Sequence, residues 1–228
     1  MAARKVYASS ENALADVFSG ATLLIGGISQ YGIPKTLINA LADKDISELV
    51  CVFSPCSEFG AFPLTALDPL LKRGQISRLI TAFPFYQNTG SLIESQWSSG
   101  NLSIEVIPQG LLSEKLRAGG AGLGGVFTPV GMGTSWSNRY ETQEIDGRQC
   151  LFLEALRGDF ALVRAQQSDN LGNLIYKGME RNWGPVMAMA ADITIAEVTD
   201  IYDAGDLDPE LIITPGIFVN RLIQSGQS

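Results

Sequence analysis

The sequence predicts an α/β protein with a mostly parallel β-sheet flanked by helices. Short apolar runs alternate along the chain with segments whose apolar residues recur at helical spacing, the pattern of parallel-sheet proteins. The chain has 228 residues, of which 46% are apolar and 18% charged, so it is too apolar to be disordered. We find no internal repeat and no polar linker, and we expect a single domain over residues 1–228.

The first expected element is a helix near the N-terminus. Ser9 or Ser10 can cap it, because a serine hydroxyl accepts from backbone N–H groups that lack a partner at a helix start. Leu14, Val17 and Phe18 follow at helical spacing and would form its apolar face.

Residues 22–34 form the most informative segment. An apolar strand over 22–25 ends in glycines and leads into a helix that begins near Pro34, whose missing N–H suits a first helical turn. Such a turn exposes backbone N–H groups at a helix N-terminus, where they can bind an anionic phosphate. The spacing of Gly27 and Gly32 fits neither the dinucleotide fingerprint nor a Walker A loop, so a tight turn without a ligand is the alternative.

The remaining elements alternate in the same way. Strands are expected over residues 48–53, 78–82, 102–107, 160–165, 174–176 and 193–198, and helices over residues 64–72, 111–117 and 187–191. We expect the helix over 111–117 to be closed by Gly119-Gly120, because glycine readily adopts the left-handed cap conformation. Residues 119–133 hold seven glycines and one proline and are predicted to be loop. Asp146-Gly147 predicts a hairpin turn between two short strands.

Composition excludes several functions. The chain carries 16 basic and 24 acidic residues, a net charge of −8, so it should repel nucleic acid and anionic membranes. No stretch approaches the roughly 20 apolar residues of a membrane span, and no secretory signal is present. Cys51, Cys56 and Cys150 lack metal-ligand spacing and the chain has no histidine, so we expect no metal site and a reduced, cytoplasmic protein.

Several residues outside the glycine turn could carry chemistry. Gln109 sits at a predicted strand end, where ligand-facing residues collect in open sheets, and its amide could donate to a carbonyl oxygen or simply bond to the backbone. Glu114 and Arg117 share a helix face and could be an ordinary ion pair. In Arg181-Asn182-Trp183 the arginine could meet a carboxylate, whereas the tryptophan is expected in the core. Among the cysteines, Cys51 lies in an apolar strand and is expected to be inert.

A resemblance to a known family covers nearly the whole chain. Its segments, in order, are residues 26–34, 108–122, 127–134, 158–163, 169–174, 181–183 and 208–221. Together they resemble the alpha subunit of the family I coenzyme A transferases, which activate 3-oxoacids. The resemblance implies an open, doubly wound α/β fold. It also implies a partner beta subunit in an α2β2 heterotetramer, and acyl-CoA and small acids as substrates with no tightly bound cofactor.

The resemblance further implies how the site would work. In the family, the beta subunit supplies a glutamate that attacks the acyl-CoA thioester and carries CoA as a glutamyl thioester, so this chain is expected to hold no catalytic nucleophile of its own. Gln109 would be a carbonyl or oxyanion donor. The glycine turn would approach CoA through its backbone, with the binding residues Gly26, Gly27, Ile28, Ser29, Gln30, Tyr31 and Gly32.

The chain departs from the family pattern in places that bear on the substrate. Ile28 replaces the usual phenylalanine, Pro55 and Cys56 replace an asparagine pair, and aromatic residues replace a polar run after the third strand. Those aromatic residues, Phe83, Phe85 and Tyr86, are predicted to line the acyl pocket and to favour an acid bulkier or more apolar than acetoacetate, or else to fill the core.

The remodelled pocket leaves other functions open. A hydrolase or ring-opening lyase on the same fold is one alternative to the transferase, and a non-catalytic ligand-binding partner is another.

Overall fold

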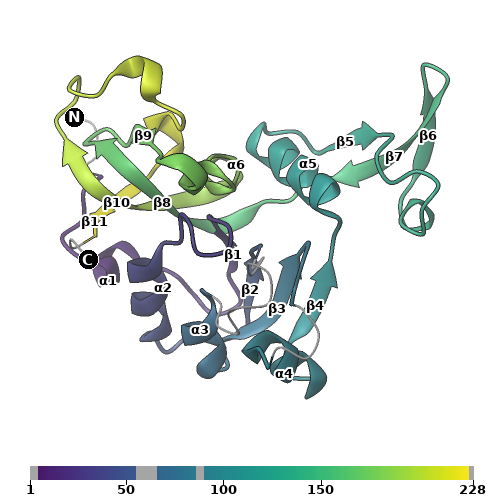
Figure 1. The fold of residues 1–228 in the computed structure, drawn as a ribbon, viewed down its shortest axis with the longest axis horizontal. Helices are drawn as coiled ribbons and strands as arrows, with labels where there is room; N and C mark the ends of the chain where they lie inside the picture. Colours follow the sequence, from purple (N-terminus) through teal and green to yellow (C-terminus); the bar gives the residue numbers. More distant parts are fainter. Residues whose placement is uncertain (1–4, 55–65, 86–89, 226–228) are drawn as a thin grey trace.

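The computed structural model describes residues 5–54, 66–85 and 90–225, and its centre is a mostly parallel sheet. In spatial order the strands are β11 (Arg221–Gln224), β10 (Ala191–Tyr202), β8 (Gly158–Asp169), β1 (Thr22–Ile25), β2 (Leu49–Val52), β3 (Ile76–Thr81) and β4 (Ser103–Val106). All neighbours along this path pair in parallel, and β9 (Leu174–Ile175) adds an antiparallel pair to β8. The predicted mostly parallel sheet is confirmed (Figure 1).

The strand order makes the sheet doubly wound. From β1 the chain moves outward through β2, β3 and β4, then returns to β8 on the other side of β1 and moves outward through β10 to β11. The order therefore reverses between β1 and β8, the point at which open α/β sheets bind ligands beyond the carboxyl ends of the strands.

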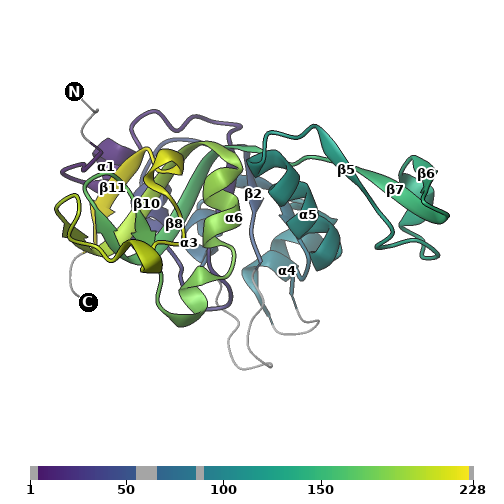
Figure 2. The same ribbon diagram turned by 90° about the horizontal axis from the view of Figure 1, so that it is seen from above.

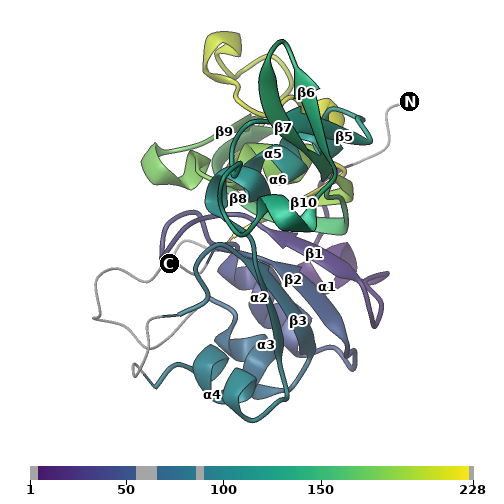
Figure 3. The same ribbon diagram turned by 90° about the vertical axis from the view of Figure 1, so that its right-hand side faces the viewer.

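Helices cover both faces of this sheet. On one face lie α1 (Ser10–Ala13), α2 (Lys35–Ala42), α3 (Asp68–Lys72) and α4 (Leu92–Ser98), and on the other α5 (Gln109–Gly120) and α6 (Gly184–Met189). Residues of β1 alternate between the two layers: Leu23 and Ile25 join the α1–α4 core, whereas Leu24 joins the core under α5 and α6. Figure 3 shows the two layers above and below the sheet.

A second, antiparallel sheet extends away from the central one (Figure 2). It consists of β5 (Gly125–Thr128), β7 (Arg148–Glu154) and β6 (Thr142–Ile145), in that order. Asp146 and Gly147 have φ values of 50° and 72°, the left-handed conformation that a tight hairpin turn needs, so the predicted hairpin is confirmed. Short 3₁₀ turns complete the described fold at Ser137–Arg139, Gly178–Arg181, Pro209–Leu211 and Gly216–Phe218.

Some expected elements were wrong in extent. The first helix is capped by Ser9 as expected but ends at Ala13, and Phe18 is exposed rather than buried on a helix face. Pro34 is the N-cap of α2 rather than its first helical residue. The helix expected at 187–191 begins earlier, at Gly184, where Pro185 suits the first turn, and it ends at Met189.

The glycine-rich stretch after residue 118 is not all loop. Gly119 and Gly120 lie inside α5, because a Cβ at Gly119 would stand 2.2 Å from the Leu156 carbonyl oxygen and one at Gly120 would stand 2.8 Å from Met189 Cβ. These two glycines serve close packing rather than a left-handed helix end, and β5 begins only five residues later.

Two elements, α4 and β11, were not anticipated. Ser91 caps α4 by accepting from the backbone N–H of Glu94, a Ser-x-x-Glu spacing that is visible in the sequence and typical of a helix start.

Candidate functional site

The carboxyl ends of the parallel strands bring the candidate residues to one edge of the sheet. The glycine turn follows β1, Phe83 follows β3, and Gln109 follows β4. Because the chain order reverses between β1 and β8, this edge also contains the switch point.

The glycine turn is held closed by its own backbone. The N–H of Ile28 donates to the carbonyl of Tyr31 and the N–H of Tyr31 donates back, each at 2.9 Å. Gly27 has a φ of 93°, and a Cβ there would meet the Gly32 carbonyl oxygen at 2.6 Å. Gly32 has a φ of 66° and faces Glu180 Cα, which a Cβ would approach to 2.7 Å. Both glycines are therefore required by the turn itself.

The N-terminus of α2 already holds a protein carboxylate. The backbone N–H groups of Thr36 and Leu37 donate to one Glu197 carboxylate oxygen at 2.8 and 3.3 Å. The other oxygen accepts from Arg164 at 2.9 Å, and the Glu197 side chain is only 2% exposed. This carboxylate takes the place at the α2 N-terminus that the sequence suggested for a phosphate.

The outer part of the turn is differently placed. Gln30 and Tyr31 are exposed, and Ser29 has a φ of 54°, a left-handed conformation that is unusual for a serine. The Ser29 hydroxyl oxygen is buried and has no hydrogen-bond partner within the described residues. Strained backbone and an unpaired hydroxyl are features that collect at ligand sites, although contact with CoA stays a prediction.

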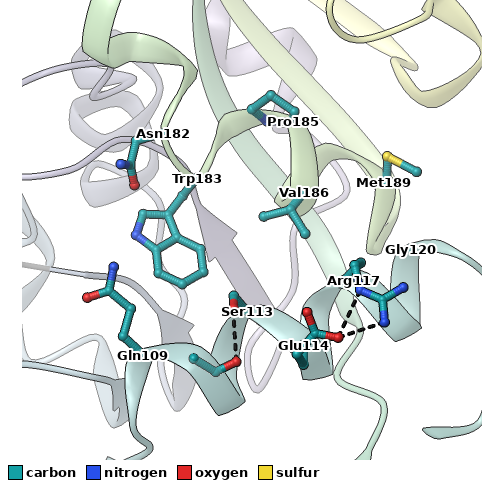
Figure 4. Close-up of a pocket in the computed structure, with 11 residues that line it drawn as sticks. Gln109, Ser113, Glu114, Arg117, Gly120, Asn182, Trp183, Pro185, Val186 and Met189 are labelled. Atoms are coloured by element: carbon teal, nitrogen blue, oxygen red, sulfur yellow. Dashed lines mark hydrogen bonds and ion pairs between the residues drawn. The ribbon is translucent and has the colours of Figure 1, made fainter. Parts of the chain in front are cut away.

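The principal cleft lies between α5 and α6 and has a volume of about 500 Å³ (Figure 4). Gln109, Ser113, Glu114 and Arg117 line it from α5, and Trp183, Pro185, Val186 and Met189 from α6 and its N-cap, together with Gly110, Gly120 and Asn182. Gln109, the Glu114–Arg117 pair and Asn182-Trp183, which the sequence presented as separate candidates, thus share one site. Arg181 is not among the lining residues, and Trp183 is buried as expected.

The charges of this cleft are neutralised in pairs. Arg117 Nε and one terminal nitrogen donate to the same Glu114 oxygen at 2.9 and 2.6 Å, and this hydrogen bond raises the pKa of Arg117 above its usual value. The predicted ion pair is confirmed. A paired Glu114 carboxylate is poorly suited to attack a thioester, because the guanidinium stabilises its charge.

The aromatic residues predicted for the acyl pocket lie elsewhere along the edge. Phe83 is 53% exposed. Phe85 packs against the α1–α4 core, and its ring centroid lies 5.7 Å from that of Trp97. Neither lines the α5–α6 cleft, and Tyr86 falls outside the described residues. The core alternative accounts for Phe85, while a pocket role for Phe83 stays a prediction.

The cysteines that the structure describes are buried thiols. Burial raises the pKa of Cys51 to about 12, so this thiol stays protonated and inert, as expected. Pro55 and Cys56 lie outside the described residues. Over residues 5–54, 66–85 and 90–225 no group of histidine, cysteine, aspartate or glutamate could hold a metal ion. Within the same ranges, no helix has the length and apolar character that crossing a bilayer requires.

The fold and the cleft define an open, doubly wound α/β protein with a candidate binding site beyond the carboxyl ends of its strands. The family model of Coenzyme A transferase matches residues 7–225, so the chain belongs to the coenzyme A transferase family.

Relatives of known name place the chain within this family. One of the two subunits of the 3-oxoadipate CoA-transferase of Pseudomonas putida is 38% identical over 96% of this chain and 93% of its own length. A subunit of the probable succinyl-CoA:3-ketoacid coenzyme A transferase of Bacillus subtilis is 39% identical over 96% of this chain and 89% of its own. The alpha subunit of the acetate CoA-transferase of Escherichia coli K12 is 36% identical over 92% of both chains. The chain is therefore the alpha subunit of a CoA transferase.

Solved structures agree on the fold. An acyl-CoA transferase of Escherichia coli O157:H7, determined as a thioester complex with CoA, superposes with a TM-score of 0.82 at 22% identity. The match covers 97% of the present chain but 47% of that one, so this chain spans about half of the larger protein.

Sequence reasoning missed important parts of the site. Val186 and Met189 were assigned to no site, and Glu197 was overlooked although it is the lone acidic residue in an apolar strand. A carboxylate in such a strand requires a buried partner and was the available signal.

Proposed function

We propose that this alpha subunit, joined to a beta subunit, transfers CoA from an acyl-CoA to a 3-oxoacid. The names of the relatives from Pseudomonas putida and Bacillus subtilis support this substrate class. Each of these relatives is named as one subunit of its enzyme, which supports a partner for this chain, and an α2β2 assembly is the arrangement we expect.

The observation that carries the proposal is the position of Gln109 at the start of α5 and at the cleft. Pro108 is the N-cap of this twelve-residue helix and makes no side-chain capping hydrogen bond. The first N–H groups of the helix therefore retain their partial positive charge toward the cleft. The Gln109 amide adds a donor at the same point, so a thioester oxygen that gains negative charge there would be stabilised.

The nucleophile is assigned to the partner. A glutamate oxygen of the beta subunit would attack the thioester carbonyl carbon, and cleavage of the C–S bond would release CoA as the thiolate and leave an acyl-glutamyl anhydride. The thiolate would then attack the glutamyl carbonyl carbon, giving the glutamyl-CoA thioester and the free carboxylate of the first acid. A 3-oxoacid carboxylate reverses both steps and leaves as its CoA thioester. No oxidant or reductant is needed.

The carboxylates that this chain brings near the edge support that assignment. Glu114 is paired with Arg117, and Glu197 with Arg164 and the N–H groups of α2. The Glu180 carboxylate lies 3.6 Å from Arg164 and accepts from the Lys177 backbone N–H. Each would lose a stabilising partner on attacking a carbonyl carbon. The glycine turn, with Ser29 at its outer corner, is proposed to contact CoA beside them.

The test uses the complex reconstituted from both subunits, with acetoacetate and 3-oxoadipate as acceptors. We expect the alpha chain alone to be inactive and Gln109→Met to lower kcat about a hundredfold, the usual effect of losing one oxyanion donor. Gln149→Met, on the hairpin far from the cleft, is the matched control and should leave kcat unchanged. Unchanged kcat in Gln109→Met, or transfer catalysed by the alpha chain alone, would overturn the proposal.

A further inference from the structure

Trp183 presents an unpaired hydrogen-bond donor in the cleft wall. The residue is 4% exposed, and its indole Nε1 has no acceptor within the described parts of the chain. Buried polar side-chain atoms nearly always have a partner, so an unpaired indole N–H requires a physical reason. A phenylalanine would fill similar space without that cost.

The side chain nearest in direction to this donor is Gln109. Figure 4 shows the nitrogen-bearing edge of the Trp183 ring facing the amide end of Gln109, and both residues line the α5–α6 cleft. Trp183 is the N-cap of α6 and Gln109 the first residue of α5, so the pair joins the starts of the two helices that form the cleft.

The chemistry of the two groups is complementary. An indole N–H only donates, whereas a glutamine amide has one accepting oxygen and two N–H donors. A half-turn about the last side-chain torsion exchanges the positions of the amide oxygen and nitrogen, and this torsion is soft. One of the two amide orientations therefore turns Oε1 toward the indole and leaves the NH₂ group for another acceptor.

We propose that Trp183 is a positioning residue: its Nε1–H donates to Gln109 Oε1 and fixes the amide with its NH₂ group directed at the substrate carbonyl oxygen. The inference rests on the proposed function, because it assigns an orientation to the donor named there. It also explains why a tryptophan occupies this buried position. The free side chain would divide its time between a donating and an accepting face, and only the donating face stabilises an oxyanion.

The principal experiment measures steady-state kinetics of the αβ complex carrying Trp183→Phe. We expect kcat to fall about fivefold, the effect of one neutral hydrogen bond, with KM for acyl-CoA nearly unchanged. The melting temperature should not fall, because the variant removes a buried donor while it keeps an aromatic ring. Trp136→Phe in the projecting sheet is the matched control and should not change kcat.

The double variant separates an action through Gln109 from an independent one. If Trp183 acts through Gln109, Trp183→Phe/Gln109→Met should be no slower than Gln109→Met alone. A further fivefold loss in the double variant would overturn the inference. Loss of kcat in Gln109→Met with wild-type kcat in Trp183→Phe would overturn the inference and leave the proposed function standing. Wild-type kcat in both would overturn the proposed function as well.

A spectroscopic measurement covers the case in which Trp183→Phe fails to assemble. The chain has three tryptophans, so 5-fluorotryptophan labelling gives three fluorine resonances in the complex. Gln109→Met should shift one resonance and leave the other two in place. A spectrum in which no resonance moves would overturn the inference.

Discussion

Two helices begin at the same edge of the sheet, and their N-termini differ in what they hold. The first N–H groups of α2 donate to the buried Glu197 carboxylate, which Arg164 also neutralises. The first turn of α5, after Pro108, has no side-chain cap and opens on the cleft. Both starts follow a strand and a proline, yet only the second is free to meet a ligand.

The comparison teaches that a glycine-rich turn before a helix creates a demand for negative charge without saying what meets it. At α2 the demand is met by a residue 161 positions away in the sequence. At α5 no described side chain meets it. The composition of the turn is local, whereas the identity of the anion depends on the tertiary structure.

The largest effect should come from removing the carboxylate at α2. Glu197→Ala leaves Arg164 and the N–H groups of Thr36 and Leu37 without their buried partner, and we expect a loss of about 3–5 kcal/mol in the free energy of unfolding. Urea unfolding followed by circular dichroism would measure it. Glu144→Ala, on exposed β6, is the control and should stay within about 0.5 kcal/mol of the parent. Equal midpoints for the two variants would show that α2 does not depend on this carboxylate.

A smaller loss is expected from crowding the α2 turn. Gly32 and Gly74 have nearly equal φ values of 66° and 65°, but a Cβ at Gly32 would lie 2.7 Å from Glu180 Cα, whereas nothing lies within 4 Å of one at Gly74. Gly74→Ala should therefore cost only the left-handed backbone penalty of about 1–2 kcal/mol. Gly32→Ala should cost roughly 1–3 kcal/mol more, because backbone must move. Thermal denaturation of both variants isolates the steric part, and equal melting temperatures would contradict the close packing of the turn.

The smallest effect, of opposite sign, is expected at the start of α5. Gly110 lies in the first turn, and its only near neighbour among the described residues is a Val130 methyl group 3.8 Å from an added Cβ. Gly110→Ala should therefore stabilise the protein by about 0.5–1 kcal/mol, because alanine loses less backbone entropy in a helix. A lower melting temperature would indicate that the first turn of α5 is not helical in solution.

Much of the central fold was accessible from the sequence because its signals are local. The apolar run before Gly26 and the Asp146-Gly147 turn each specify their structure within a few residues, and both are observed. The extension of α5 through Gly119 and Gly120 could not be foreseen, because contacts with distant Leu156 and Met189 override the low helix propensity of glycine.

The site was predictable as a set of parts rather than as an arrangement. Gln109, Glu114 and Trp183 were each identified from their neighbours in the chain, but their convergence depends on the packing of α5 beside α6. The buried partner of α2 was invisible for the same reason, since Glu197 meets Thr36 only after β10 has joined the sheet.

The central position of β1 has a consequence for synthesis on the ribosome. One side of β1 can pair with β2 early, but the other waits for β8, and the hydrogen bond from the Thr22 N–H to Asp159 spans 137 residues. A nascent chain that has completed β4 therefore presents β1 as an unprotected apolar edge, the kind of surface that invites aggregation and chaperone binding. The sheet is finished only when Leu222 donates its N–H to the Lys5 carbonyl, so the two ends of the molecule meet at the last step of folding.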